Sequence, residues 1–157
     1  MFISLDKIDK KAKCWVYILE KNCAEVRDDL HCFLKELCDT WVSHNQNVIA
    51  SYKIYNDSHI VLFAENSISG CSIDSSNKLI RKKLNDLNIG IMPNSKIGIF
   101  NDKKLVYYNR LSLINKLKNK ELLINDKMID TTIQTKDDFD KKWIVEINKS
   151  WLINFIK

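Results

Sequence analysis

The fold is decided by residues 48–64, which have the sequence VIASYKIYNDSHIVLFA. Apolar side chains alternate with polar neighbours through the first part of this stretch, at Val48, Ala50, Tyr52 and Ile54. Such alternation is typical of a strand with one buried face, and the nearly unbroken apolar run His59–Ala64 is typical of a strand in the middle of a sheet. The polar residues 56–58 favour a turn between the two, so the stretch predicts a β-hairpin.

The elements on either side of this hairpin follow from their periodicity. Residues 14–19 form a short β-branched and aromatic run, which predicts a first strand. Apolar side chains recur every three or four positions over residues 23–41, which predicts a helix. A second helix, capped by Asp74 or Ser75, should end near Gly90.

A second hairpin is predicted by residues 96–100 and 105–108, and Ser112 should cap a short helix that ends in a loop at 116–120. The tail adds a strand at 129–133, a helix opened by Thr135 and a last helix that includes Trp151 and Ile156. The first six elements, in the order βαββαβ, are those of a sandwich in which two helices cover one face of an antiparallel sheet. We therefore expect an α+β fold: a single-domain, ferredoxin-like βαββαβ-type sandwich with an extra hairpin strand and C-terminal helices.

The whole chain, residues 1–157, is expected to form one domain. Its length is ample for a buried core, and one proline and three glycines leave no stretch typical of a linker. The five cysteines are odd in number and lie mostly on apolar faces, which favours reduced thiols and a cytoplasmic protein. No apolar run reaches the roughly 20 residues needed to cross a bilayer, so we expect no membrane insertion.

The formal net charge of +5 is weak evidence for an anionic partner. Of the 25 basic residues only Arg27, Arg81 and Arg110 are arginine, and lysine, asparagine and isoleucine are abundant throughout. Each of these three abundant types has codons made of A and T alone, so an A/T-rich genome accounts for the composition. A basic surface indicates nucleic-acid binding only where it clusters on one face, so a nucleic-acid partner is open but not favoured.

A candidate site lies at residues 69–76, which have the sequence SGCSIDSS and stand between a predicted strand and a predicted helix. Backbone N–H groups at a helix start can hold an anion, and a thiol there can become more acidic. The candidate ligand-binding residues are Gly70, Ser72, Asp74, Ser75 and Ser76. Cys71 is the candidate nucleophile and His44 the candidate base, provided that the fold brings them together. Helix capping and turn formation alone would also account for these small polar residues.

Other kinds of site are disfavoured. None of the three glycines is followed by the Lys and Ser or Thr of a P-loop, and the Rossmann fingerprint fails for the same lack of glycines. The histidines and cysteines of residues 31–44 lack the paired spacing of zinc ligands, so we expect no metal and no cofactor. The glycine- and aromatic-rich strand signature of RNA-recognition sheets is also missing.

Several separated stretches carry a family resemblance: Phe33 to Trp41 and His44, the hairpin ending at Glu65, Gly70 to Ser76, Thr135-Lys136, Trp143 and Ser150-Trp151. Through them nearly the whole chain resembles a small, largely uncharacterised family of bacteroidete bacteria whose members commonly carry the name ABC transporter ATPase. The resemblance implies family membership and a shared site region, of which residues 70–76 are the most specific part. ATPase activity is not supported, because the chain has neither a P-loop nor the Leu-Ser-Gly-Gly-Gln signature of an ABC cassette.

Three functions from different classes stay open. The leading hypothesis is a cytoplasmic binding module that takes a small anionic ligand, or a protein partner, at residues 70–76. The second is a thiol enzyme with Cys71 as nucleophile, and the third is an RNA- or ribonucleoprotein-associated factor. Since the other four cysteines fall on apolar stripes, Cys71 should be the most accessible thiol, and a buried Cys71 would exclude the enzyme.

Overall fold

The computed structural model describes residues 1–65 and 68–156. This part of the chain contains four α-helices and three β-sheets, so the predicted α+β class is confirmed. The chain divides into two compact units: unit 1 comprises residues 1–92 and 134–137, and unit 2 comprises residues 93–133 and 138–157. Such a division does not test whether the units fold together, so a single domain over 1–157 stays a prediction. None of the helices in the described ranges is long and apolar enough to cross a membrane.

The larger sheet of unit 1 has four strands: β1 (Lys13–Leu19), β4 (Ala50–Tyr55), β5 (His59–Ala64) and β6 (Ile91–Met92). Their order is β4-β5-β1-β6, and every neighbouring pair is antiparallel. The predicted hairpin is confirmed as β4 and β5, and its turn residues Asn56 and Asp57 have φ angles of 49° and 51°. Asparagine and aspartate tolerate this left-handed conformation better than most residues. All six residues of β5 are buried, as their apolar run predicts.

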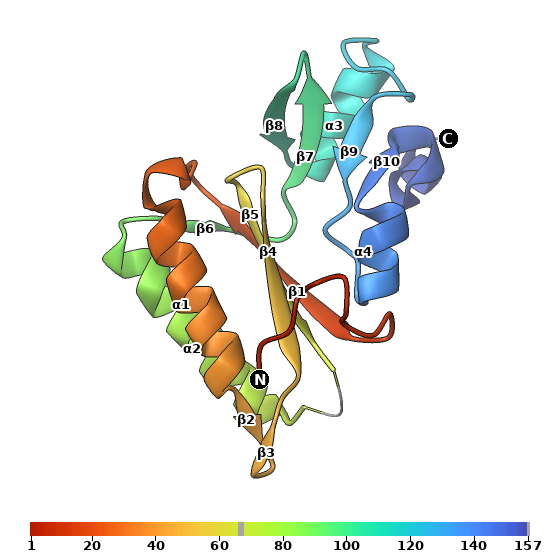
Figure 1. The fold of residues 1–157 in the computed structure, drawn as a ribbon. Coiled ribbons are helices and arrows are strands. Elements are labelled where there is room, and N and C mark those ends of the chain that lie inside the picture. The colour runs from red at the N-terminus through yellow and green to blue at the C-terminus, as the bar shows by residue number, and fades with distance from the viewer. Residues whose placement is uncertain (66–67, 157) are drawn as a thin grey trace. The chain divides into compact units, whose positions relative to one another are not determined.

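Two helices, α1 (Arg27–Thr40) and α2 (Gly70–Asp86), lie side by side on one face of this sheet, where Figure 1 shows them in orange and green. The short 3-10 helix η1 (Ala24–Val26) precedes α1. The predicted apolar stripe of the first helix is buried at Leu30, Leu34, Leu37 and Cys38. Ile80 and Leu84 of α2 join the same core cluster as Leu62 of β5, so one core holds both helices to the sheet.

A small hairpin that the sequence analysis missed follows α1 directly. Its strands, β2 (Val42–Ser43) and β3 (Gln46–Asn47), pair in an antiparallel sheet of their own. The two turn residues, His44 and Asn45, have φ angles of 52° and 59°. Two successive positive φ angles are those of a type I′ turn, which matches the twist of the strands that it joins. Figure 1 shows this hairpin near the start of α2.

Two helices begin earlier than predicted. The cap of α2 is Ser69, whose hydroxyl accepts the Ser72 N–H, rather than Asp74 or Ser75. The cap of α3 (Arg110–Lys118) is Asn109, whose side chain accepts the N–H of Ser112, the residue predicted to be the cap. In both helices the capping oxygen reaches the N–H three residues along the chain, which is the usual geometry of an N-cap. Because α3 continues to Lys118, the predicted loop at 116–120 is wrong in its first half.

Unit 2 is built on a second four-stranded sheet with the order β10-β9-β7-β8. Its strands are β7 (Ile97–Asn101), β8 (Lys104–Tyr108), β9 (Lys127–Ile129) and β10 (Ile144–Glu146). The second predicted hairpin is confirmed as β7 and β8. Its first strand was predicted as the sixth element of the sandwich, which is wrong, because β7 lies in this second sheet and the short strand β6 takes the sixth place in the sheet of unit 1. The remaining helices are α4 (Lys136–Lys142), which spans the division between the units, η2 (Ile147–Lys149) and η3 (Trp151–Phe155). The predicted last helix is therefore a short 3-10 helix.

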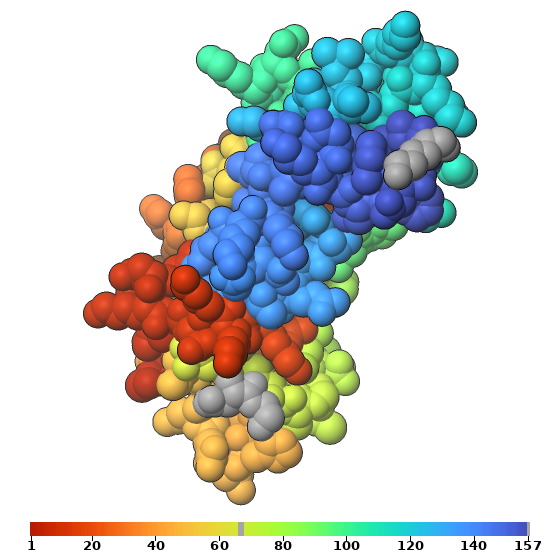
Figure 2. Space-filling view, turned by 90° about the vertical axis from the view of Figure 1, so that its right-hand side faces the viewer, coloured from red at the N-terminus to blue at the C-terminus, as the bar shows by residue number. Residues whose placement is uncertain are grey.

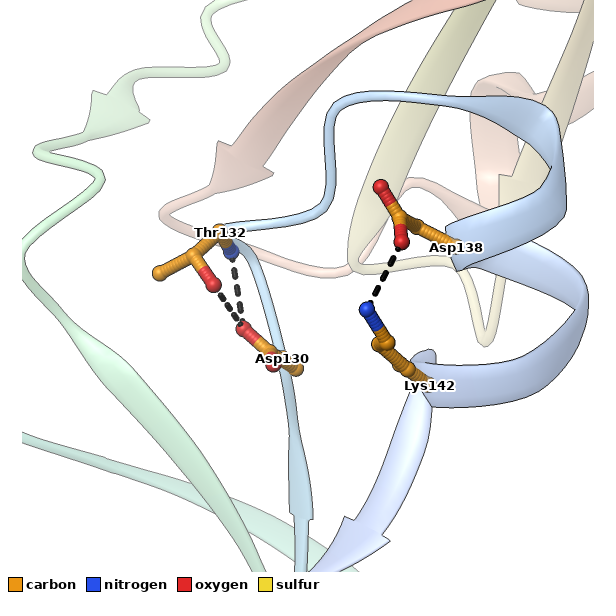
Figure 3. Close-up of polar contacts among 4 residues, drawn as sticks. All are labelled: Asp130, Thr132, Asp138 and Lys142. Carbon is orange, nitrogen blue, oxygen red and sulfur yellow. Dashed lines mark hydrogen bonds and ion pairs between the residues drawn. The ribbon is translucent and has the colours of Figure 1, made fainter. Parts of the chain in front are cut away.

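The core of unit 2 joins its sheet to α3 and to the C-terminal 3-10 helices. Its buried members include Ile99, Leu113, Met128 and Leu152. Figure 2 shows the C-terminal segment in dark blue packed against the cyan segment that contains α3. The end of β9 is fixed by a local turn, in which the Asp130 carboxylate accepts the Thr132 N–H at 2.9 Å and the Thr132 hydroxyl at 2.6 Å (Figure 3).

Candidate functional site

A pocket of about 380 Å³ opens in unit 1 beside the first turns of α2. Its lining comes from the end of α1, the β2–β3 hairpin and α2, with these residues: Leu37, Thr40, Trp41, Val42, Ser43, His44, Ser69, Cys71, Ser72, Ser75, Ser76 and Leu79. The two candidate catalytic residues, Cys71 and His44, thus line one pocket. Gly70 and Asp74 are next to lining residues along the chain but do not line the pocket themselves.

Two contacts between Ser43 and Ser69 join the β2–β3 hairpin to the start of α2. The Ser43 hydroxyl accepts the Ser69 N–H at 3.0 Å and lies 3.4 Å from the Ser69 hydroxyl. The Ser69 hydroxyl in turn accepts the Ser72 N–H at 3.2 Å and so caps the helix. Because Ser43 is buried, these contacts hold the His44 turn next to the helix start, and the pocket walls are thereby fixed.

Ser72 is held by two further contacts and acts as a positioning residue. Its hydroxyl donates to the Val42 carbonyl at 2.8 Å and accepts the Trp41 indole N–H at 2.8 Å. Trp41 is buried and its ring packs against Trp15, with 6.1 Å between ring centroids. The Ser72 hydroxyl proton is therefore already donated to the Val42 carbonyl. An anion could accept this proton only if the bond to Val42 were broken.

The other two candidate hydroxyls are also turned back onto their own helix. Ser75 donates to the Cys71 carbonyl and Ser76 to the Ile73 carbonyl, both at 2.8 Å. Such bonds to the preceding turn are the ordinary alternative for a serine within a helix. Both hydroxyl protons are therefore already donated within the helix rather than toward the pocket. Contact between these serines and a ligand stays a prediction.

The backbone at the helix start is better placed for an anion. The N–H groups of Ser72 and Ile73 are bonded to Ser69, whereas those of Gly70 and Cys71 have no hydrogen-bond acceptor among the described residues. Such N–H groups carry the positive end of the helix dipole. No carboxylate occurs among the described residues that line the pocket. Gly70 itself has a negative φ and open space where a Cβ would lie, so its backbone does not require glycine.

The thiols differ in exposure. All five cysteines are free, with Cys71 and Cys32 exposed and Cys14, Cys23 and Cys38 buried. Burial raises the pKa of Cys38 to about 12, and burial followed by the nearby Asp57 charge raises the pKa of Cys23. The prediction that four cysteines are shielded is therefore wrong for Cys32, which lies on the solvated side of α1.

No group of three or more His, Cys, Asp or Glu side chains in the described ranges could hold a metal ion. Trp41 and Ser43 were not predicted as parts of the site, and Ser69 stood in the candidate segment without a predicted role. The residue type of Ser69 was the available signal, since serine is among the favoured N-cap residues. The role of Ser43 had no such signal, because it depends on a hairpin that is distant in sequence.

The chain matches no known protein-family model, no curated protein and no solved structure.

Proposed function

We propose that the protein is a binding module that takes a small anion at the first turn of α2. The observation that carries this proposal is the pair of N–H groups, on Gly70 and Cys71, that have no acceptor in the described part of the chain at a helix start beside a pocket. His44 lines the same pocket and can donate a hydrogen bond to an anion. The absence of lining carboxylates among the described residues removes the groups that would repel one.

Inorganic phosphate is the probe that tests this proposal. In a titration followed by amide NMR, the Gly70 and Cys71 signals should shift together and saturate. Replacing the exposed Ser75 by aspartate, which puts a negative charge beside the pocket, should weaken binding by about three- to fivefold, since like charges a few ångströms apart repel by about 1 kcal/mol even in water.

The matched control is Asn85→Asp, which adds the same charge at an exposed position near the other end of α2. Phosphate should bind this variant as it binds the unchanged protein. Unmoved Gly70 and Cys71 signals, or equal weakening by the two aspartates, would contradict an anion site at the helix start.

A thiol enzyme is the second candidate, because Cys71 is exposed and shares the pocket with His44. A histidine that accepts the thiol proton raises the fraction of reactive thiolate. If the two residues act as a pair, His44→Gln should slow alkylation of Cys71 by iodoacetamide by about tenfold at neutral pH. Mass spectrometry of the labelled peptides follows each cysteine separately.

Cys32 provides the control for this experiment within the same chain. It is the other exposed thiol, it lies on α1 outside the pocket, and His44→Gln should leave its alkylation rate unchanged. Cys14, Cys23 and Cys38 are buried and should label last. Equal rates for Cys71 with and without the His44 imidazole would remove the enzyme hypothesis and leave the binding module.

The finer description of the fold is also a proposal. The order β4-β5-β1-β6, with all neighbours antiparallel and α1 and α2 on one face, supports a ferredoxin-like arrangement for unit 1. Five free cysteines support a cytoplasmic location. Membership of the bacteroidete family stays a proposal that rests on the resemblance of residues 70–76 and the other stretches named above. No contact among the described residues specifically favours the RNA-associated alternative.

A further inference from the structure

A second pocket, of about 520 Å³, lies wholly within unit 2. It is bounded by the segment before β7, the start of α3, the end of β9 and Trp151. Its volume is in the range of small-molecule sites, which is roughly 300–1,000 Å³. None of its lining residues belongs to unit 1, so this pocket is separate from the α2 site.

The walls of this pocket are largely apolar. Ile97 and Met128 are buried members of the unit 2 core, and they present part of their surface to the pocket. Leu111, which also lines it, is 72% exposed. A leucine left in water forgoes the favourable free energy of burial, about 25 cal/mol for each Å² of apolar surface, so an apolar ligand on this wall would recover part of it.

A single cation stands among the described lining residues, at Arg110. Its guanidinium lies over the Phe155 ring, with 4.8 Å from Cζ to the ring centroid. A phenyl ring has no oxygen or nitrogen acceptor, so this contact provides no conventional hydrogen-bond acceptor for the five guanidinium N–H donors. The Arg110 side chain makes no hydrogen bond or ion pair with any residue that the structure describes.

No acidic side chain competes for this guanidinium within the described lining. Asp130, which stands between the lining residues Ile129 and Thr131, does not line the pocket, and one of its carboxylate oxygens is held by the N–H and hydroxyl of Thr132 (Figure 3). Asp138, also drawn in Figure 3, pairs with Lys142 at 2.9 Å and lines a different pocket. Among the residues that the structure describes, no carboxylate pairs with Arg110, so its charge can be matched by an anion from outside the protein.

We propose that this pocket binds an amphipathic organic anion, in which a carboxylate pairs with Arg110 and an apolar chain or ring lies against Ile97, Leu111 and Met128. An arginine fork matches the two oxygens of a carboxylate, which supplies orientation as well as binding energy. The apolar walls supply the remaining contact. The ligand class follows from this combination of one unpaired cation with apolar surroundings.

Octanoate and octanol test this proposal, because they share an apolar chain and differ in the carboxylate. In a titration followed by methyl NMR, octanoate should shift the Ile97, Leu111 and Met128 methyl signals and should bind at least about tenfold more tightly than octanol. Arg110→Gln should remove that preference while octanol binding stays unchanged. Arg110 is exposed, so the variant should keep the fold, as its melting temperature would verify.

The matched control is Arg81→Gln, which removes the same charge from an exposed position on α2 in unit 1. This variant should keep the full preference for octanoate. A second variant, Leu111→Asp, should weaken both probes, octanoate more than octanol. The proposal is overturned if octanoate and octanol bind the unchanged protein equally, if Arg81→Gln and Arg110→Gln have the same effect, or if the shifted methyl groups lie outside the pocket.

Discussion

Replacing Leu62 by alanine should lower the free energy of unfolding by about 3 kcal/mol, within the 2–5 kcal/mol range typical of buried leucines. Leu62 lies in the middle of β5 and is 1% exposed. It belongs to the core cluster that includes residues of α1 and α2, and it pairs with Trp15 and Tyr52 on the two neighbouring strands. The loss combines the buried apolar area with the cavity left behind, because strands on both sides prevent the site from collapsing.

Urea denaturation followed by circular dichroism measures this loss. The matched control is Leu79→Ala, since Leu79 lies on α2 in the same unit but is 48% exposed. That change should cost less than about 1 kcal/mol. Equal losses of unfolding free energy for the two variants would mean that β5 is not the centre of the core. The hairpin of β4 and β5 would then contribute no more to stability than an exposed position on α2.

Local sequence patterns were sufficient for the main elements of the fold. The apolar run at residues 59–64 reports burial directly, and the alternation does so for Ala50 and Ile54, because a strand presents successive side chains to opposite faces. Ser51, on the opposite face of β4, is also buried, which the alternation did not predict. The three- and four-residue spacing in α1 reports burial in the same way for a helix. These patterns depend only on neighbours along the chain, which is why they were correct.

The starts of α2 and α3 were less predictable, because several nearby residues could serve as caps. Residues 69–76 contain four serines and one aspartate, and each is a favourable N-cap by type. The choice of Ser69 coincides with its contact to Ser43, which lies 26 positions earlier in the chain. Once the helix starts at Gly70, the later serines fall inside it, and Ser75 and Ser76 donate to its carbonyls.

The meeting of Cys71 and His44 in one pocket is also a tertiary result. His44 occupies the turn of a two-residue loop with positive φ angles, and Ser43 fixes that turn against the helix start. Spacing along the sequence contains no information about such a contact. The Arg110 pocket was missed for the same reason, since its walls come from segments between residues 94 and 151.

Acidification should destabilise the protein through His59, which is fully buried in β5. Burial lowers the pKa of His59 from 6.5 to about 4, and its Nδ1 lies 2.9 Å from the Ser58 hydroxyl. The unfolded chain therefore takes up a proton on this imidazole before the folded protein does. The free energy of unfolding should fall between pH 6.5 and pH 4, with no contribution from His59 above this window and no further loss below it.

The expected loss from this one residue is about 3 kcal/mol across the window, because each pKa unit corresponds to about 1.36 kcal/mol. Urea denaturation at a series of pH values gives the free energy of unfolding of the unchanged protein and of His59→Gln. The difference between the two isolates the contribution of His59, because the carboxylates titrate in both proteins. As the pH falls, the unchanged protein should lose more of its free energy of unfolding than His59→Gln loses. A constant separation between the unchanged protein and His59→Gln from pH 7 to pH 4 would mean that His59 is protonated equally in both states, which its burial in the central strand does not allow.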